Sequence, residues 1–191
     1  MRYPPEHKTE THRKIVKDAA RRIRSEGLNG AAVAAVMRDT GLTHGGFYKH
    51  FRSKDDLLRE SLREAFGEVV DLLVKNAEQA RPESAWKAIV NTYLSGGHCD
   101  HPERGCPLAA LASELARGGK QKKGQVLAEM MNYKDRMLQF MPGRRTGDKE
   151  RAFFVIFSTM VGAVEIARMM TDPKAREKFL ASTREFLLRS F

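Results

Sequence analysis

Four metal-ligating or redox-active side chains lie within nine residues of the sequence: His98, Cys99, His101 and Cys106. Their order, H-C-x-H-x4-C, lacks the paired C-x2-C spacing of a structural zinc site, so we expect no metal here. Cys106 precedes Pro107 at the start of an expected helix, where free backbone amides would stabilise a thiolate. A thiol sensor of oxidants or electrophiles, a thiol enzyme with a histidine partner, and a helix junction with unreactive cysteines all fit this segment.

The rest of the sequence lacks the motifs that are typical of an enzyme active site. No Gly-rich phosphate loop, carboxylate pair or metal motif accompanies the cysteines, so we expect no catalytic residue and no cofactor. A chain with only two cysteines is typical of proteins in a reducing compartment, where we expect both to be free thiols. The chain opens without an apolar leader, and its longest apolar run, 152–164, is too short to cross a bilayer. A cytoplasmic protein without a membrane partner is expected.

A second group of chemically active side chains is basic and aromatic and occupies the stretch GLTHGGFYKHFRSKDDL, residues 41–57. Two adjacent glycines, Gly45 and Gly46, stand where the apolar spacing predicts a helix, although each costs about 1 kcal/mol in a helix interior. Phe47 and Phe51, four residues apart, would share the inner side of that helix. The glycines therefore indicate a surface where the backbone itself approaches a ligand.

The charge balance points to a polyanionic ligand. The chain has a formal net charge of +10, and residues 1–60 contain 13 Lys and Arg against 8 Asp and Glu. Half of the excess charge thus falls in less than a third of the chain. Clustered cations bind nucleic acid through the release of counterions, so the N-terminal third is the expected contact.

The apolar pattern is helical throughout, with no alternation typical of strands. It predicts a basic amphipathic helix over 9–26, a short helix over 31–38, a third from Thr43, and a long one from Ser53 to about residue 80. Ser53 and Asp56 form a capping-box pattern at the start of the long helix. Further helices are expected around 86–93 and near 104–117, 122–140, 148–171 and 174–190.

The second and third helices, joined by the turn D-T-G-L, form an expected helix-turn-helix whose second helix enters the major groove of DNA. With Phe47 and Phe51 facing inward, the residues left toward DNA are Thr43, His44, Gly45, Tyr48 and Lys49. Lys54 would add its charge to the free amides at the start of the long helix.

Residues 9–60 resemble the N-terminal domain of TetR-type (TetR/AcrR family) transcriptional regulators. The family motif, G-V-S-x-G-x-L/F-Y-x-H/Y-F followed by x-S-K-x-x-L, is matched at Gly41, Leu42, Thr43, Gly45, Phe47, Tyr48, His50, Phe51, Ser53, Lys54 and Leu57. The resemblance implies that Thr43, Tyr48, His50 and Lys54 contact phosphates and that His44, Gly45 and Lys49 lie nearest the bases. The sequence departs from the family at the start of the second helix, where Gly30, Ala31 and Ala32 replace the usual Thr or Ser; Asn29 is the candidate cap.

The resemblance implies an all-α fold of about nine helices. A three-helix DNA-binding domain would cover residues 1–60, with its reader at about 32–51, and an effector-binding and dimerisation domain would cover 61–191. In the apolar stretch 151–170, Ser158 and Gly162 would let two helices approach closely beside Phe154, Phe157 and Val161, as a dimer interface or as part of the chain's own core. A dimer would read a pseudo-palindromic operator.

Aromatic, sulfur-containing and apolar side chains between these regions either fill the core or enclose an apolar or aromatic effector. The candidate pocket residues are Trp86, Tyr93, Cys106, Met130, Met131 and Phe140. The predicted function is a dimeric repressor released from operator double-stranded DNA by a small-molecule effector. The alternatives are a redox-sensing or electrophile-sensing regulator acting through Cys106, a Cys/His thiol enzyme, and an architectural DNA binder.

Overall fold

The computed structural model of the chain describes residues 5–31, 33–39, 41 and 44–191. Within these residues the fold is all-α: ten α-helices and four short 3₁₀ turns, without a strand. The α-helices are α1 Pro5–Glu26, α2 Val33–Asp39, α3 His44–Phe47, α4 Lys54–Glu78, α5 Ala85–Tyr93, α6 Gly96–Asp100, α7 Pro107–Ala116, α8 Lys120–Met137, α9 Thr146–Ala167 and α10 Pro173–Ser190. The all-α prediction is confirmed, and the helix count of about nine is close to the observed ten.

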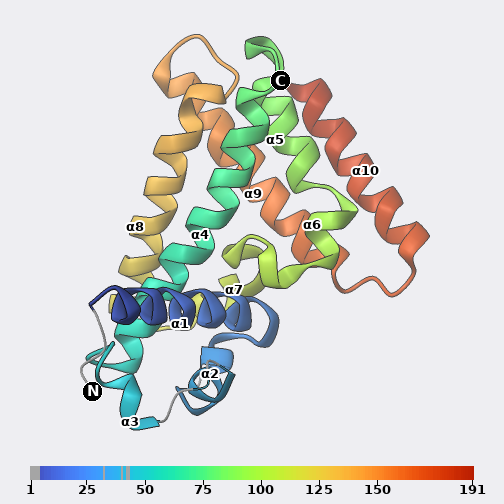
Figure 1. The fold of residues 1–191 in the computed structure, drawn as a ribbon. Helices are drawn as coiled ribbons and strands as arrows, with labels where there is room; N and C mark the ends of the chain where they lie inside the picture. The colour runs from blue at the N-terminus through green and yellow to red at the C-terminus, as the bar shows by residue number, and fades with distance from the viewer. Residues whose placement is uncertain (1–4, 32, 40, 42–43) are drawn as a thin grey trace.

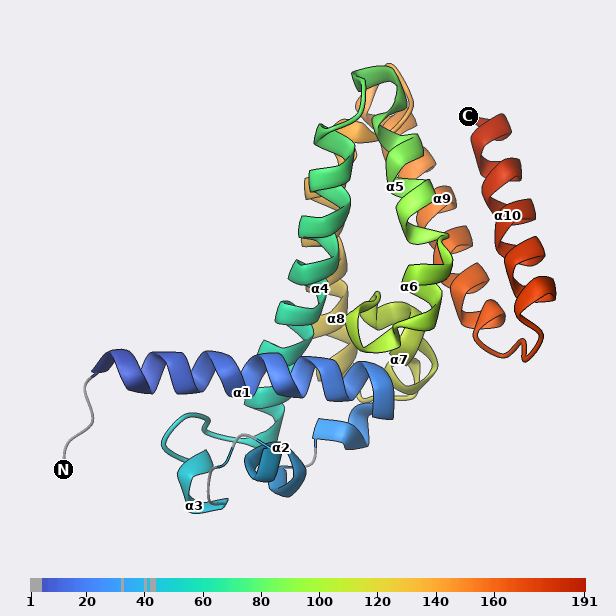
Figure 2. The ribbon, with the colours of Figure 1, turned by 45° about the vertical axis from the view of Figure 1, so that its right-hand side comes forward.

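The helices form two tiers joined by α4 (Figures 1 and 2). α1 crosses the lower half of α4, and α2 and α3 lie below it. α5 and α8 lie along the upper part of α4, α9 lies behind them, and α10 lies beside α9 at the outer edge. Because α4 is one continuous helix of 25 residues, it runs through the expected domain boundary at residue 60.

Each tier has its own apolar core, and a third cluster lies between them. The lower core contains the residues that the spacing placed inside: Ile15, Val16, Ala19, Val33, Val36, Met37, Phe47, Phe51 and Leu57. The upper core is built around α4, α5 and α9 and includes Phe66, Trp86, Tyr93 and Phe153. The cluster between them joins Ile23, Leu58 and Leu62 to Leu111, Leu115 and Val126. Through this middle cluster the lower tier packs against apolar side chains of α7 and α8.

Several predicted boundaries were wrong. α1 begins at Pro5, before the predicted Thr9, and α6 appears in a segment rich in Gly and His for which no separate helix was predicted. The third helix is shorter than predicted: α3 ends at Phe47, and residues 48–50 form turns. Among the described helices, none combines the length and the apolar character needed to cross a membrane.

Candidate nucleic-acid interface

Phe47 and Phe51 anchor the reader, defined here as α2, α3 and the turn residues 48–51. Both side chains are buried, and their rings stack with centroids 5.3 Å apart. The predicted contact between residues i and i+4 therefore forms even though α3 is short, because the amide of Phe51 still donates to the carbonyl of Phe47. Gly41 has a positive φ of 71°, a conformation that glycine adopts without strain, and this turns the chain between α2 and α3.

The outward side of the reader carries aromatic and basic groups. Tyr48 is 67% exposed, and Lys49 is exposed beside it. Gly45 is exposed, and a Cβ added there would meet no atom within 4 Å. Thr43 and the His44 side chain, both predicted to face DNA, lie outside the described parts of the structure. Among the described residues no contact requires glycine at position 45, and its open Cβ position leaves room for a partner to approach the backbone.

His50 occupies a more enclosed position than the other predicted contacts. It is half-buried, with its ring centroid 5.9 Å from that of His12. Burial, followed by the nearby charges of His12, Lys8 and Lys49, lowers the pKa of His50. The free chain therefore disfavours the charged imidazole, and a phosphate contact at His50 would use a ring N–H group.

The start of α4 is capped as the sequence predicted, with one difference. The Ser53 hydroxyl accepts a hydrogen bond from the Asp56 amide at 3.1 Å. The Asp56 carboxylate does not return to the Ser53 amide; it accepts from the Arg52 amide at 3.3 Å and pairs with Arg59. Lys54, in the first turn, is exposed. A cation thus stands beside the free amides of a long helix, an arrangement that favours a phosphate.

The segment before α2 differs from the expected helix start. Residues Leu28–Ala31 form a 3₁₀ turn, and α2 begins at Val33. Asn29 lies inside this turn, so it does not directly precede the α-helix as the predicted cap would. The backbone amide of Leu28 donates to the Glu114 carboxylate of α7 at 3.1 Å. This turn connects the lower tier to the upper tier.

Arg24 makes a second polar connection between the tiers. Its side chain is buried on α1 and donates to the carbonyls of Ala65 on α4 and Gly105 before α7, at 3.5 and 3.3 Å. It also pairs with Glu68 at 2.5 Å. An arginine on the basic helix therefore bonds inward to the upper tier and is not available to DNA. The sequence offered no signal for this, because Arg24 looks like its exposed neighbours.

The His-Cys segment is a polar junction in the upper tier. His98 donates through Nδ1 to the Tyr93 carbonyl at 2.7 Å and accepts through Nε2 from the Cys106 amide at 3.0 Å. These bonds need the neutral imidazole, and burial lowers the pKa of His98 to about 4. Arg168 of α9 donates to the carbonyls of His98, Cys99 and Ala109. Among the described residues, no group of three or more His, Cys, Asp or Glu could hold a metal ion.

Both cysteines are free and buried. Cys106 is 0% exposed, and burial raises the pKa of its thiol, although the nearby Tyr93 side chain and the backbone at the start of α7 act to lower it. Burial also raises the pKa of Cys99. The expected stabilisation of a thiolate by the helix start is therefore outweighed by desolvation, and neither cysteine has the exposed, low-pKa environment of a reactive thiol.

The six candidate pocket residues do not all lie together. Trp86, Tyr93 and Cys106 belong to the upper core, and Met130 and Phe140 pack against it. Met131 is half-buried outside that cluster. Tyr133 is a residue the sequence reasoning missed: its hydroxyl is buried near Cys106, and burial raises its pKa well above the usual value. In the sequence, only the place of Tyr133 within the Met-rich stretch 130–137 indicated that its side chain faces the core.

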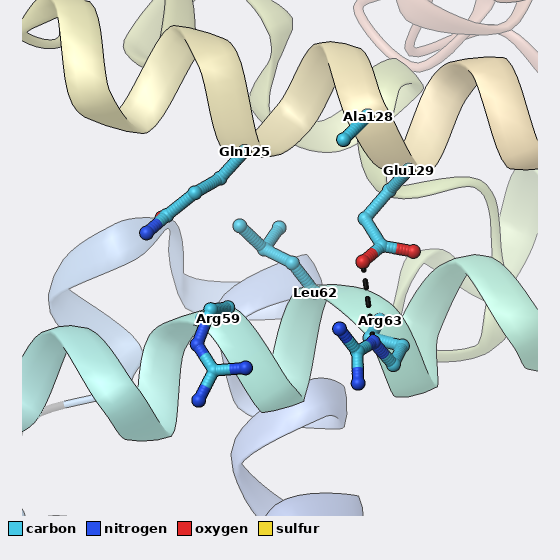
Figure 3. Close-up of a pocket in the computed structure, with 6 residues that line it drawn as sticks. All are labelled: Arg59, Leu62, Arg63, Gln125, Ala128 and Glu129. Carbon is cyan, nitrogen blue, oxygen red and sulfur yellow. Dashed lines mark hydrogen bonds and ion pairs between the residues drawn. The ribbon is translucent and has the colours of Figure 1, made fainter.

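Two hollows lie on the outside of the fold, between α4 and α8. One, of about 130 Å³, is lined by Arg59, Leu62, Arg63, Gln125, Ala128 and Glu129 (Figure 3). The other, of about 200 Å³, shares Arg59 and Gln125 with the first and extends to the start of α4. Both are smaller than the roughly 300 Å³ of ordinary ligand pockets, and none of the six candidate residues lines either.

An apolar face remains open on α9 and α10. Phe154, Val155 and Ile166 are each nearly half exposed, and Phe186 is 67% exposed. Ser158 is exposed on this face, Val161 and Gly162 are partly exposed, and a Cβ added at Gly162 would meet no atom within 4 Å. Phe157, which was grouped with the dimer residues, points the other way: it is 6% exposed and stacks on Phe153 in the core.

The sequence of the reader and the helices around it matches a known family. Residues 15–61 match the family described as bacterial regulatory proteins, tetR family. The N-terminal segment 15–61 is therefore of the TetR type. The matched segment contains most of α1, all of α2 and α3, and the first turns of α4, so it covers the whole lower core.

Solved TetR-family structures share the whole fold. A TetR transcriptional regulator from Chloroflexus aurantiacus superimposes with a TM-score of 0.77 at 21% identity, over 96% of this chain and 97% of that one. A TetR-family regulator from Cytophaga hutchinsonii gives 0.77 at 17% identity, over 98% of both chains. FadR from Bacillus subtilis, solved in complex with stearoyl-CoA, gives 0.68 at 17% identity, over 94% and 98%. No curated protein matches the sequence.

Proposed function

We propose that this protein is a homodimeric repressor of the TetR family that binds a pseudo-palindromic operator and is released by a small effector. The observation that carries the proposal is the outward side of the reader and the start of α4: Tyr48, Lys49 and Lys54 are exposed, the Cβ position of Gly45 is open, and Phe47 and Phe51 are buried. Such a surface brings the backbone close to base edges while the cations neutralise phosphates. Binding to chromosomal DNA would place the protein in the cytoplasm.

Within this surface we assign Tyr48 and Lys54 to phosphates and Gly45 and Lys49 to the base edges. Both pairs are exposed. We assign His50 to the phosphate contacts as well, through a ring N–H group. Thr43, a phosphate contact, and His44, a base contact, complete the proposed set on the basis of the family motif. The domain division at about residue 60 is kept as a functional boundary, since the lower core ends at Leu57.

The proposed dimer interface is the open face of α9 and α10. Phe154, Ser158, Val161 and Gly162 follow one side of α9 at three- and four-residue spacing, and Phe186 of α10 adds an exposed aromatic ring. Phe157 is left out because it packs in the core. A two-fold dimer through this face would bury apolar area that the single chain leaves in water.

The proposed effector is a small apolar or aromatic molecule that enters the upper core. Trp86, Tyr93 and Cys106 line this core, and Met130 and Phe140 border it. Met131 stays among the proposed pocket residues, although it does not pack against the upper core. FadR of B. subtilis, with the same fold, is seen with stearoyl-CoA. An effector here would have to separate packed helices, since Tyr93 and Tyr133 are among the most completely buried side chains.

Release would follow from the polar connections between the tiers. Gly105 accepts from Arg24 on α1, and the amide of its neighbour Cys106 is fixed by His98. A molecule that displaces Cys106 would therefore shift the carbonyl that holds α1, while movement of α4 would change the separation of the two readers. Effector binding then favours a conformation with low operator affinity, which is a population shift.

Selection of bound duplexes from a random pool tests the proposal. We expect a two-fold-related motif whose affinity exceeds that of random DNA by roughly 10³ or more. Selection repeated with and without reductant should recover the same motif, because both thiols are buried. Binding that is strong, salt-dependent and indifferent to sequence would instead identify an architectural DNA binder. Failure of every compound in a broad effector screen to change operator affinity would overturn the release mechanism.

A further inference from the structure

A second cationic surface lies beside the reader, at the start of α8. Residues 115–128 contain four cations and no acidic residue. Arg117, Lys120 and Lys123 are exposed, and within the described residues no ion pair involves them. Lys122 is half-buried and reaches Asp55 at 3.9 Å. We call these four residues the α8 basic surface.

The three lysines of this surface do not stabilise α8, the helix that carries them. The first turn of α8 contains no acidic residue, and its N-cap, Gly119, supplies no side-chain hydrogen bond. Positive charge at a helix N-terminus opposes the helix dipole and costs up to about 1 kcal/mol for each residue. Because these lysines lower the stability of the first turn of α8, their presence indicates that they contact a partner outside the helix.

The α8 basic surface is close to the proposed phosphate contact of α4. The ion pair from Lys122 ends on Asp55, the residue directly after Lys54. The 200 Å³ hollow between the two helix starts is lined from α4 by Arg52, Ser53, Asp55, Asp56 and Arg59 and from α8 by Gln121 and Gln125. Figures 1 and 2 show the lower end of α8 beside the lower half of α4. The pair between Arg63 and Glu129, at 3.2 Å, joins the two helices further up (Figure 3).

We propose that the α8 basic surface binds backbone phosphates of duplex DNA that flanks the operator half-site. The inference rests on the proposed operator binding and extends it, because α8 belongs to the effector-binding tier. DNA held at Lys54 would pass near Lys120 and Lys123, whose charges have no partner in the described chain. The contact is electrostatic, so it adds affinity without reading sequence.

The test uses the full-length chain and a duplex carrying the selected operator, in one version trimmed to the two half-sites and in another extended by about one helical turn on each side. The variant Lys120→Gln/Lys123→Gln should weaken binding to the extended duplex only. The slope of log affinity against log salt should fall by roughly 0.9 for each phosphate that is no longer neutralised. The matched control is Arg144→Gln/Arg145→Gln, which removes two exposed charges from the loop before α9.

A charge-reversal variant separates this role from a structural one. Lys120→Glu/Lys123→Glu places acidic residues at the start of α8, where the helix dipole favours them, so thermal stability should be kept or raised. Affinity for the extended duplex should nevertheless fall further than with glutamine. An unchanged affinity, or an equal loss on both duplexes, would overturn the inference while leaving operator binding in place. If the unaltered chain binds no selected duplex, it is the proposed function that fails.

Discussion

The guanidinium of Arg24 on α1 lies 3.3 Å from the carbonyl oxygen of Gly105, 81 residues further along the chain. This hydrogen bond joins the helix that braces the reader to the segment beside Cys106, His98 and Arg168. The DNA-binding tier is therefore attached to the upper tier both through α4 and through a buried polar contact. The predictions below address this contact, the histidine behind it, the reader, the open face of α9 and the thiols.

Replacing Arg24 by methionine should destabilise the fold by about 2–3 kcal/mol. The change leaves the Glu68 carboxylate without its buried cation and removes the side-chain hydrogen bonds to three backbone carbonyls. The value lies below that of a completely buried pair because the Glu68 side chain is one third exposed. Urea unfolding would measure it. Arg189→Met, which breaks a pair with an 80% exposed arginine, should cost less than about 0.5 kcal/mol. Equal losses in the two variants would contradict the assigned role.

The His98 imidazole should make stability depend on pH between about 4 and 6.5. Its folded pKa is about 4, and burial is the main cause, with a further lowering by Arg168 and Arg24. In this window the unfolded chain binds a proton that the folded chain excludes, so the free energy of unfolding falls as the pH falls, by at most about 3 kcal/mol in total. Above pH 6.5 the contribution is constant.

Urea unfolding of His98→Asn at several pH values checks this dependence. The difference in stability between the unaltered chain and the variant should shrink as the pH falls from 6.5 to 4. His101→Asn is the control, because that ring is exposed. A difference that stays constant with pH would show that the pKa of His98 is the same in the folded and unfolded chains.

Replacing Gly45 by a large residue should leave the fold intact but weaken DNA binding. Gly45→Leu places its side chain in open space in the free chain, and the position has no positive φ, so the melting temperature should be kept. Operator affinity should fall at least tenfold, about 1.4 kcal/mol, because the side chain would stand between the backbone and DNA. Melting curves and binding titrations give the two readouts. Gly46→Ala should be tolerated in both, and a Gly45→Leu protein that binds normally would remove Gly45 from the interface.

Gly162→Leu should convert the dimer into a monomer without unfolding it. The Cβ position at Gly162 is open in the single chain, but it lies on the proposed interface beside Phe154 and Ser158. Sedimentation equilibrium would report the mass. Gly67→Leu is the matched control, a helical glycine on α4 whose Cβ position is equally open. A dimer that survives Gly162→Leu would move the interface away from this side of α9.

The two thiols should be protected in the folded chain. Cys99 and Cys106 are buried and their pKa values are raised, so both thiolate content and access are low. A thiol-reactive disulfide reagent at pH 7 should modify them at least about 100-fold more slowly in buffer than in urea. Rapid modification of Cys106 in the folded chain, together with loss of operator binding, would establish the thiol-sensing alternative.

Much of the fold and of the reader could be predicted because their signals are local. The periodic apolar residues of α1 and α4, the Ser53 cap and the pair Phe47 and Phe51 depend on spacing along one helix. Errors arose where a segment is too short for its own pattern to decide, as at α3 and at the 3₁₀ turn before α2. In such segments tertiary contacts outweigh a propensity of about 1 kcal/mol per residue.

The sequence by itself determined an all-α chain with a helix-turn-helix near its N-terminus, because helix periodicity and the positions of Gly41, Phe47 and Phe51 are properties of neighbouring residues. The tertiary structure alone decided that Arg24 turns inward, that Phe157 lies inside while Phe154 lies outside, and that Cys106 is buried. Each of these outcomes depends on which distant helix covers a side chain. Burial determines both the pKa of a thiol and the contribution of an ion pair to stability. No local sequence pattern indicates which of these side chains a distant helix will bury.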